Sequence, residues 1–358
     1  IGRSDGEVYE ALAEAWVRQI EMAVDSGHTT EAFYASALAA SDKSALAEPT
    51  NIGGPLKKAQ ATLMTMAVAF AGTTSLEGTQ RCMRWATEAL QKQPSNPYAA
   101  DVAANCLLLT AERMMASGQN PETVIRQAVA LLESAVIRYP MFLWGLNDLA
   151  NIHMQSGAFL STKDRTRALD SLAKSLQYQT SAINLDDSYL TAASNSLYAW
   201  GMIASLSINK TDLSSIISGA DGIFRKCISI NSKWSQCYNN YFQIYVRAAQ
   251  RIYLAEEDPQ PYLARAMESI VKLRELGGQF LDLEQYHAVL QLITASDLVR
   301  RRQNPIDALT KLEAALNRCF AIAAQDAMCR AISAQAEWVA ADWAAQHDKP
   351  VRPCLQRA

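Results

Sequence analysis

Two pairs of cysteines are the residues of this sequence whose spacing is most specific for a chemical role. Cys227 and Cys237 lie ten positions apart, and Cys319 and Cys329 repeat that spacing 92 residues later. If the members of a pair lie on neighbouring helices, a disulfide bond between them would stabilise the fold by roughly 2–3 kcal/mol. The alternative is that each cysteine replaces alanine as a small buried residue. We expect two disulfide bonds and therefore an extracytoplasmic (periplasmic) compartment; without the bonds, a cytoplasmic protein is expected.

The remaining cysteines and the histidines do not indicate a metal site. Cys82, Cys106 and Cys354 have no partner that the sequence identifies. The pairs ten residues apart lack a second nearby pair of ligands, which a zinc site would need. The four histidines are too far apart in the chain for metal-ligand spacing. We therefore expect no metal ion and no other cofactor.

The sequence lacks the common catalytic motifs. The sequence contains no Gly-x-Ser-x-Gly, no phosphate-binding loop, no His-Glu-x-x-His and no calcium-binding EF-hand loop. The acidic run Glu256-Glu257-Asp258 is interpreted as a solvated loop rather than a general acid and base. We expect a protein that is not an enzyme.

Small residues recur along the chain with a period of about 46 residues. In each copy a second small residue follows ten positions after the first, and a residue that ends a helix lies between them, as Pro94 and Pro140 do. Small side chains late in one helix and early in the next let the two backbones approach closely. The period therefore predicts stacked helix pairs. The first members of the five copies are Ala89, Ala135, Ala182, Cys227 and Cys319.

This pattern resembles the tetratricopeptide repeat (TPR), whose usual unit is about 34 residues. The unit here is longer, and we place the extra residues between the two helices of each pair. The resemblance covers roughly residues 75–358 and implies an all-α fold, an α-solenoid of antiparallel helix pairs wound into a right-handed superhelix. We interpret residues 1–54 as a divergent N-terminal helical pair and loop, and residues 55–358 as the repeat array, which ends in a truncated repeat.

Apolar periodicity and turn residues give the expected boundaries of the helices. The clearest loop is expected at residues 44–54, because Pro49, Gly53 and Gly54 fall there. In the least regular pair, we place the two small positions at Ile270 and Phe280. The expected helices are 5–25, 30–41, 55–71, 74–93, 97–117, 121–139, 141–156, 162–185, 188–207, 211–230, 233–256, 259–276, 280–302, 305–323 and 326–346.

Two short segments are similar to the repeat arrays that follow the kinase domain in bacterial, myxobacterial-type serine/threonine protein kinases. They are Asp258–Ala266, with its Asp-Pro entry into a helix, and His347–Ala358. No kinase motif is present in the chain itself. The resemblance therefore implies the non-catalytic part of a signalling protein.

In TPR arrays the first helices of successive pairs line a concave groove that binds peptides. Carried onto this sequence, the groove positions hold amide, hydroxyl and aromatic side chains, which suit a protein or peptide ligand. The lysine and asparagine pairs that bind a terminal carboxylate in this family are not reproduced. The alternative is that these are ordinary exposed polar residues. The groove candidates are Asn147, Asn151, Ser194, Tyr198, Asn239, Gln243 and Arg247.

Composition narrows the classes of partner. The net charge is −3 and basic residues are scattered, so no nucleic acid is expected as a partner. The longest apolar stretches are too short to cross a membrane. A homo-oligomer is compatible with the sequence.

Three functions compete for this pattern. The first is a non-catalytic protein-binding or sensor module, and the second is a periplasmic transporter-associated or scaffold TPR protein that binds a small ligand. The third is an α/α-toroid glycoside hydrolase, which needs two acidic residues at one site. The aromatic residues that would favour such an enzyme, among them Trp234 and Trp338, are interpreted as packing residues instead.

Overall fold

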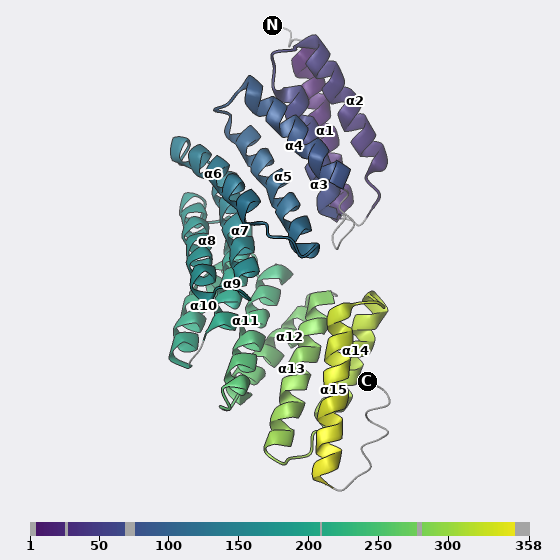
Figure 1. Cartoon of the computed structure of the whole chain (residues 1–358), viewed down its shortest axis with the longest axis vertical. Helices are drawn as coiled ribbons and strands as arrows, with labels where there is room; N and C mark the ends of the chain where they lie inside the picture. The colour runs from purple at the N-terminus through teal and green to yellow at the C-terminus, as the bar shows by residue number, and fades with distance from the viewer. Residues whose placement is uncertain (1–4, 26–27, 69–75, 208–209, 278–280, 348–358) are drawn as a thin grey trace. The chain divides into compact units, whose positions relative to one another are not determined.

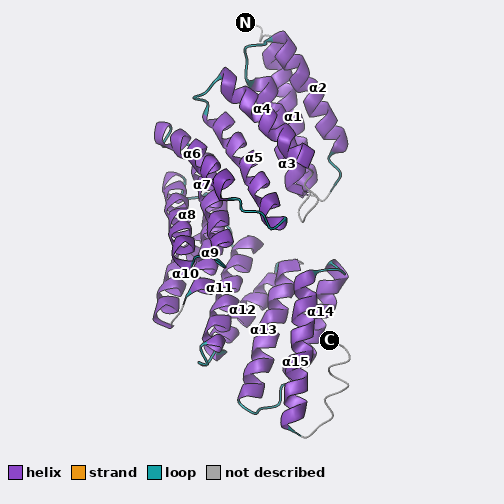
Figure 2. Cartoon of the chain, in the orientation of Figure 1, coloured by secondary structure: helices purple, strands orange, loops and turns teal. Residues whose placement is uncertain are grey.

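The computed structural model describes residues 5–25, 28–68, 76–207, 210–277 and 281–347, and these residues form helices and connecting turns without a strand (Figure 2). The helices are α1 (Asp5–Asp25), α2 (Glu31–Ala47), α3 (Gly53–Val68), α4 (Leu76–Lys92), α5 (Pro97–Ala116), α6 (Glu122–Arg138), α7 (Leu143–Leu160), α8 (Arg165–Leu185), α9 (Leu190–Leu206), α10 (Lys210–Ile230), α11 (Ser235–Leu254), α12 (Gln260–Glu275), α13 (Leu281–Arg300), α14 (Ile306–Ile322) and α15 (Ala327–Gln346). The chain divides into two compact units, which we name unit 1 (residues 1–187) and unit 2 (residues 188–358).

Each unit is a stack of helix pairs (Figure 1). In unit 1 the first helices of the pairs are α1, α3, α5 and α7. Each packs against the second helix of its own pair, and α1, α3 and α5 also pack against the first helix of the next pair. In unit 2, α9, α11 and α13 are arranged in the same way, and α15 packs against α13 and α14. The all-α solenoid of antiparallel helix pairs expected from the sequence is therefore confirmed.

The small residues that define the period are buried, and Ala89, Ala135, Cys227 and Cys319 lie where one pair packs on the next. Ala89, Ala182, Cys227 and Cys319 are completely buried, and Ala135 is nearly so. The residues ten positions later, which begin the next first helix, are buried as well. Close approach of the backbones at these positions explains why the sequence keeps small side chains there.

One register differs from the expectation. In the pair formed by α12 and α13, the equivalent positions are Leu273 and Leu283, both completely buried, and not Ile270 and Phe280. Leu273 lies 46 residues after Cys227 and 46 residues before Cys319, so the corrected register restores the period of the repeat. Ile270 is buried on the same face of α12, so apolar periodicity alone did not separate the two alternatives. Phe280 lies outside the described residues.

Turns within the pairs follow a common design. An asparagine or aspartate side chain accepts a hydrogen bond from the backbone N–H two residues later, across the intervening proline, and so caps the second helix. These residues are Asn120, Asp258 and Asn304. A left-handed residue precedes each of them at the same point of the repeat, namely Gly118, Glu256 and Arg302. The helix starts expected at residues 121, 259 and 305 are each shifted by one residue, because the proline is the N-cap and the helix begins after it.

The loop expected at residues 44–54 is shorter in the structure. Helix α2 continues to Ala47, and α3 already begins at Gly53. Ser44 is buried and donates a hydrogen bond to the backbone oxygen of Gly6, which anchors the end of α2 on α1. A Cβ atom on Gly54 would lie 2.8 Å from the backbone oxygen of Ser41, so glycine here permits close packing of α3 on α2.

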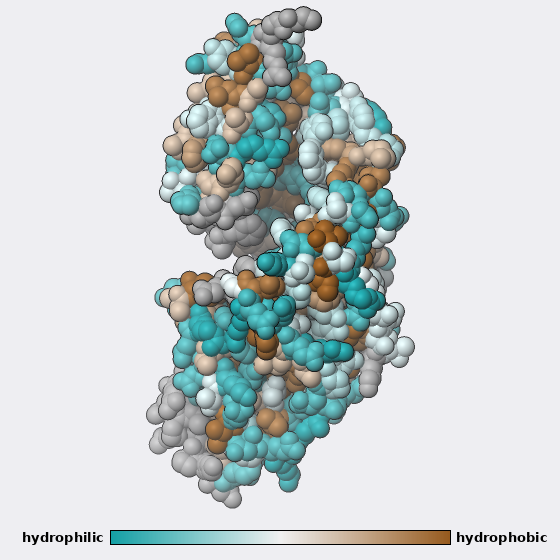
Figure 3. Space-filling view, turned by 180° about the vertical axis from the view of Figure 1, so that it is seen from behind, coloured by the Kyte–Doolittle hydropathy of each residue, from teal (hydrophilic) through white to brown (hydrophobic). Residues whose placement is uncertain are grey.

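The surface contains scattered apolar residues rather than one large area. The face in Figure 3 is mostly hydrophilic, with hydrophobic residues in small separate groups. Two tryptophans interpreted as packing residues are exposed instead, Trp338 by 71% and Trp234 by 39%. Among the described residues, no helix is both long and apolar enough to span a bilayer.

Candidate functional site

The predicted groove residues all lie on first helices but are divided between the two units. Asn147 and Asn151 belong to α7 in unit 1. The other five belong to α9 and α11 in unit 2. The sequence therefore assigned the correct helices, and the structure presents two separate surfaces to consider.

In unit 2, several of these polar side chains are buried between first helices. Ser194, Asn239 and Gln243 are each no more than 3% exposed. The neighbouring Asn240 donates from Nδ2 to the backbone oxygen of Ser194 at 2.8 Å and to its hydroxyl at 3.1 Å. This bond links α11 to α9 across one repeat, so part of the predicted set holds the helices together.

Arg247 is partly exposed and connects three first helices of unit 2. Its Nη2 donates to the hydroxyl of Tyr286 on α13 at 2.7 Å. Its guanidinium also lies over the rings of Tyr198 on α9 and Tyr286, with centroid distances of 5.6 and 5.7 Å. A cation between two aromatic rings is stabilised by both. The arrangement fixes Arg247 and leaves Tyr198 and Arg247 as the partly exposed groove candidates of unit 2.

The first helices of unit 1 enclose an open hollow of about 720 Å³, which we call the first-helix hollow. It is lined from all four first helices, α1, α3, α5 and α7, and from the turn before α5. The lining residues are Glu7, Glu10, Ala11, Glu14, Arg18, Ile52, Leu56, Lys57, Gln60, Gln93, Asn96, Tyr98 and Trp144. Its size is within the range of about 300–1,000 Å³ that is typical of ligand sites.

One wall of the hollow is acidic. Glu7, Glu10 and Glu14 follow one another at helical spacing on the same face of α1. Glu14 forms an ion pair with Lys57 of α3 at 2.5 Å. Burial opposes ionisation of Glu14, but the hydrogen bond and charge of Lys57, together with Arg18, outweigh it and lower its pKa. Three carboxylates against Lys57 and Arg18 leave this wall with a negative balance.

The opposite side of the hollow carries two exposed aromatic rings. Trp144 is 51% exposed and Tyr98 is 43% exposed. Their ring centroids lie 5.8 Å apart, and Tyr98 also contacts the buried Phe142 edge to face at 5.2 Å. Packing on Phe142 holds the pair in place while large parts of both rings remain open. Fixed aromatic rings of this kind are common anchors for a protein partner.

A pair of carboxyl groups lies further along the same helices. Asp148 of α7 accepts hydrogen bonds from Asn105 of α5 at 2.7 Å and from Asn147 at 2.9 Å. Burial, followed by the charge and hydrogen bond of Asp148, raises the pKa of Asp101 on α5 well above its usual value. Burial also raises the pKa of Asp148. Both shifts favour the protonated form of these buried carboxyl groups.

This carboxyl pair does not match the requirement of a glycosidase. The two catalytic acids of such an enzyme stand about 5–9.5 Å apart, with room for the sugar or a water molecule between them. Asp148 is instead held by hydrogen bonds from Asn105 and Asn147, and burial raises the pKa of both acids. The α/α-toroid alternative gains no support from them.

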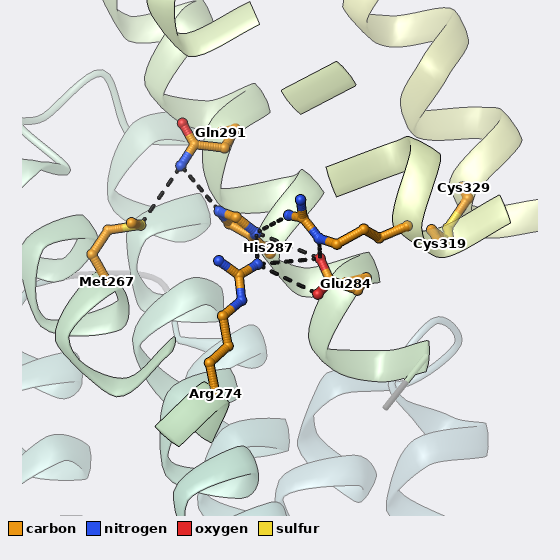
Figure 4. Close-up of polar contacts among 8 residues, drawn as sticks. Met267, Arg274, Glu284, His287, Gln291, Cys319 and Cys329 are labelled. Carbon is orange, nitrogen blue, oxygen red and sulfur yellow. Dashed lines mark hydrogen bonds and ion pairs between the residues drawn. A yellow bond between two sulfur atoms is a disulfide. The ribbon is translucent and has the colours of Figure 1, made fainter. Parts of the chain in front are cut away.

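A second polar cluster, which the sequence did not reveal, lies in unit 2 among α12, α13 and α14 (Figure 4). Glu284 of α13 accepts from Nε of Arg318 on α14 at 2.9 Å and lies 3.4 Å from Nη2 of Arg274 on α12. Nη2 of each arginine also lies close to Nδ1 of His287, at 3.0 and 3.2 Å. Gln291 continues the cluster along α13 and lies 3.4 Å from the other ring nitrogen of His287.

The cluster stabilises the ionised form of a nearly buried acid. Burial raises the pKa of Glu284, but hydrogen bonds with His287 and Arg318 and the charges of both arginines lower it to about 2. The three helices are thus joined through one carboxylate. The sequence signal was limited to Glu284 and His287 three residues apart on an otherwise apolar face, and the arginines come from distant segments.

The six described cysteines form three pairs. Cys227 is joined to Cys237 and Cys319 to Cys329, with Cα–Cα distances of 6.4 and 6.6 Å. Cys82 and Cys106, which the sequence left without partners, form the third pair at 5.8 Å. Every bond links the second helix of one pair to the first helix of the next. Cys354 lies outside the described residues.

One group of potential metal ligands accompanies the last of these bonds. Asp326 lies close to the sulfur atoms of Cys319 and Cys329. Its Oδ1, however, accepts a hydrogen bond from the N–H of Cys329 at 2.8 Å and so caps α15. With both sulfurs engaged in a disulfide bond and the carboxylate in a cap, this group does not fit a metal site.

Comparison with solved structures identifies the fold of this chain. No protein-family model and no curated protein sequence matches the chain. Among solved structures, it is similar to a TPR protein from Parabacteroides merdae, with 12% identity and a TM-score of 0.52, covering 91% of this chain and 99% of that one. It also matches a thermophilic TPR protein from Thermus thermophilus, with 16% identity, a TM-score of 0.41 and coverage of 65% and 98%. The TPR-like helical array recognised in the sequence is thereby confirmed.

Proposed function

We propose that this chain is a non-catalytic binding module, and that the first-helix hollow of unit 1 binds a basic segment of a partner protein. The observation that carries the proposal is the combination of an acidic wall and two exposed aromatic rings around a hollow of about 720 Å³. Lysine or arginine side chains of a partner would pair with Glu7 and Glu10. The faces of Trp144 and Tyr98 can accept both cations and apolar side chains.

An extended peptide fits this surface better than a small molecule. The lining comes from four successive first helices, so contacts are distributed along the stack. Gln60, Gln93 and Asn96 add amide groups that can both donate to and accept from a peptide backbone. The surface thus offers charge, aromatic and backbone-directed contacts at successive points.

We propose further that the module works in an oxidising compartment. Support comes from the three cysteine pairs, each at a distance suited to a disulfide bond. Cytosolic proteins of ordinary organisms seldom keep such bonds. Attachment to a serine/threonine kinase is a proposal that depends on the sequence similarity of residues 258–266 and 347–358, and the reading frame around this chain would test it.

The binding proposal is tested with fluorescent ten-residue peptides, one alternating lysine with alanine and one alternating glutamate with alanine. We expect the lysine peptide to bind in fluorescence anisotropy, and salt to weaken it. The double variant Glu7→Gln/Glu10→Gln should lose about tenfold in affinity, which corresponds to about 1.4 kcal/mol.

The matched control is Glu268→Gln/Glu275→Gln, which removes the same charge from exposed positions on α12. This control should bind like the parent protein. Equal binding of both peptides, or an unchanged affinity of the α1 variant, would refute the proposed site.

A further inference from the structure

A second cavity of unit 1, whose lining shares Asn96 with the first-helix hollow, lies in the cleft between α4 and α6 above α5. We call it the α4–α6 cleft, and its volume is about 540 Å³. Within the described residues both second helices pack against α5 but not against each other, which leaves the space open. Its lining residues are Met83, Thr87, Leu90, Pro94, Ser95, Asn96, Ala100, Ala103, Leu107, Gln127, Ala130, Leu131, Ser134, Ala135 and Arg138.

The lining combines an apolar interior with one positive charge. Ala100 and Ala103 form a floor of small side chains on α5, and methionine and leucine side chains form much of the walls. Arg138 is the one charged residue of the lining and is exposed at the end of α6. No ion pair of its guanidinium is found among the described residues. A ligand with an apolar body and a single negative group would complement both features.

The repeat itself supplies a comparison for this cleft. Lining positions on the helices have equivalents 184 residues later, four periods on, in the cleft of α12, α13 and α14, whereas the equivalents of Pro94, Ser95 and Asn96 lie outside the described residues. There the floor consists of Glu284, His287 and Gln291 where the α4–α6 cleft has Ala100, Ala103 and Leu107. Likewise Arg274 and Arg318 stand where Leu90 and Ser134 line the cavity.

In that second cleft the side chains satisfy one another. Figure 4 shows Arg274 beside Glu284 and His287. Arg318 contacts the same two residues from α14, so the charges of both arginines meet that of Glu284 inside the cleft. The two clefts thus share an arrangement of helices but differ in the side chains that line them. The apolar lining of the α4–α6 cleft is a property of these particular residues, and the helix-pair geometry does not impose it.

The cysteine pair of unit 1 adds rigidity at the cleft. Cys82 and Cys106, which are bonded, precede Met83 and Leu107 in the chain, and both of those residues line the cavity. The bond therefore fixes the α4 wall relative to the α5 floor. A cavity held open in this way binds without the loss of free energy that ordering its walls would require.

We propose that the α4–α6 cleft binds a small single-chain amphiphile, with its aliphatic part in the cavity and an anionic head group paired with Arg138. A volume of about 540 Å³ is suited to a small molecule, because such sites span about 300–1,000 Å³. The two sites share Asn96 in the turn before α5, but the charged residues on which each proposal depends are different.

Binding of three twelve-carbon probes to the whole chain tests the site: dodecanoate, dodecanol and dodecyltrimethylammonium. Each is titrated calorimetrically below its micelle concentration. We expect dodecanoate to bind tightest. Arg138→Gln should weaken dodecanoate about tenfold and leave dodecanol unchanged, since only the head-group contact is lost.

A pair of matched substitutions tests the location. Ala130→Phe would fill the α4–α6 cleft and should abolish binding, whereas Ala314→Phe makes the same change at the equivalent position of α14 and should leave it unchanged. Both alanines are exposed helix residues, and circular dichroism checks that both variants fold. The proposal is overturned if no probe binds, if the two phenylalanine variants behave alike, or if the cationic probe binds as well as dodecanoate.

Discussion

The first helices of unit 1 carry acidic and aromatic side chains that remain exposed, whereas those of unit 2 carry amide and hydroxyl groups buried between helices. In unit 1, Trp144 and Tyr98 stand open beside Glu7 and Glu10. In unit 2, Asn240 bonds to Ser194 across one repeat. The same stacking of helix pairs therefore leaves charged and aromatic side chains exposed in unit 1, whereas in unit 2 polar side chains join one first helix to the next.

Charge follows the same division. Residues 1–187 contain 20 acidic and 15 basic side chains, and residues 188–358 contain 16 acidic and 18 basic ones. The small net charge of the whole chain thus combines an acidic unit 1 with a slightly basic unit 2. Small buried side chains are therefore a constant feature of the repeat, whereas the charged positions vary from one copy to the next.

Reduction of the disulfide bonds should have the largest effect and should affect unit 2 more. Unit 2 has two bonds that each close a ten-residue separation, and unit 1 has one that closes 24 residues. On the chain-entropy estimate reduction costs about 5 kcal/mol in unit 2 and about 3 kcal/mol in unit 1. Hydrogen exchange with and without reductant measures the loss of stability in each unit separately.

Thiol titration of the unreduced, denatured chain is the control for this comparison. Of the seven cysteines, no more than one should react, because six are paired. Seven reactive thiols would show that cysteine only replaces alanine at these positions, and the proposed oxidising compartment would be abandoned.

Removal of the central acid of the polar cluster should destabilise unit 2. Breaking a buried charge network costs about 3–5 kcal/mol, but Arg274 and Arg318 are 43% exposed, so we expect about 2 kcal/mol for Glu284→Ala. Because the pKa of Glu284 is lowered to about 2, its contribution is present above about pH 4.5 and is lost as the pH falls toward 2. Urea unfolding at several pH values measures both effects.

Glu268→Ala is the matched change, because Glu268 belongs to an ion pair whose two side chains are about two-thirds exposed. It should alter stability by less than about 0.5 kcal/mol. A similar loss in both variants would mean that the cluster has no special role in joining α12, α13 and α14.

The carboxyl pair of unit 1 should show the opposite dependence on pH. Since the pKa of Asp101 is raised, its contribution to stability is full at low pH and declines as the pH rises through the folded-state value. Asp101→Asn keeps a hydrogen-bond donor toward Asp148 without a second charge. We expect it to stabilise unit 1 by about 1 kcal/mol at pH 7 and to remove the decline.

Asp170→Asn, an exposed position on α8, should leave both the stability and its pH dependence unchanged. If Asp101→Asn instead destabilises unit 1 at neutral pH, the raised pKa of Asp101 is not a feature of the folded state.

The sequence predicted the frame of the molecule well, for identifiable reasons. Recurrent alanine and cysteine mark close contacts between backbones, and Asn-Pro and Asp-Pro mark capped helix starts, so both signals are local. The register near Leu273 was missed because leucine occupies a position that is small elsewhere.

Sites formed by distant repeats were harder to foresee. Helical periodicity assigns a residue to a face, but it does not say whether a neighbouring helix covers that face. Asn239 and Gln243 were therefore expected in a groove, and the structure buries them. Asp101 with Asp148, and Arg274 with Arg318, meet only through the stacking of repeats, which no local pattern records.

The most direct test of the proposed binding surface is photo-crosslinking of the lysine peptide, carrying one benzoylphenylalanine, to the whole chain. Mass spectrometry of the digested complex locates the attached residues. We expect crosslinks within residues 7–18, 52–60, 93–98 and around Trp144, the lining of the first-helix hollow. Crosslinks confined to residues 188–347 would contradict the assignment of partner binding to unit 1.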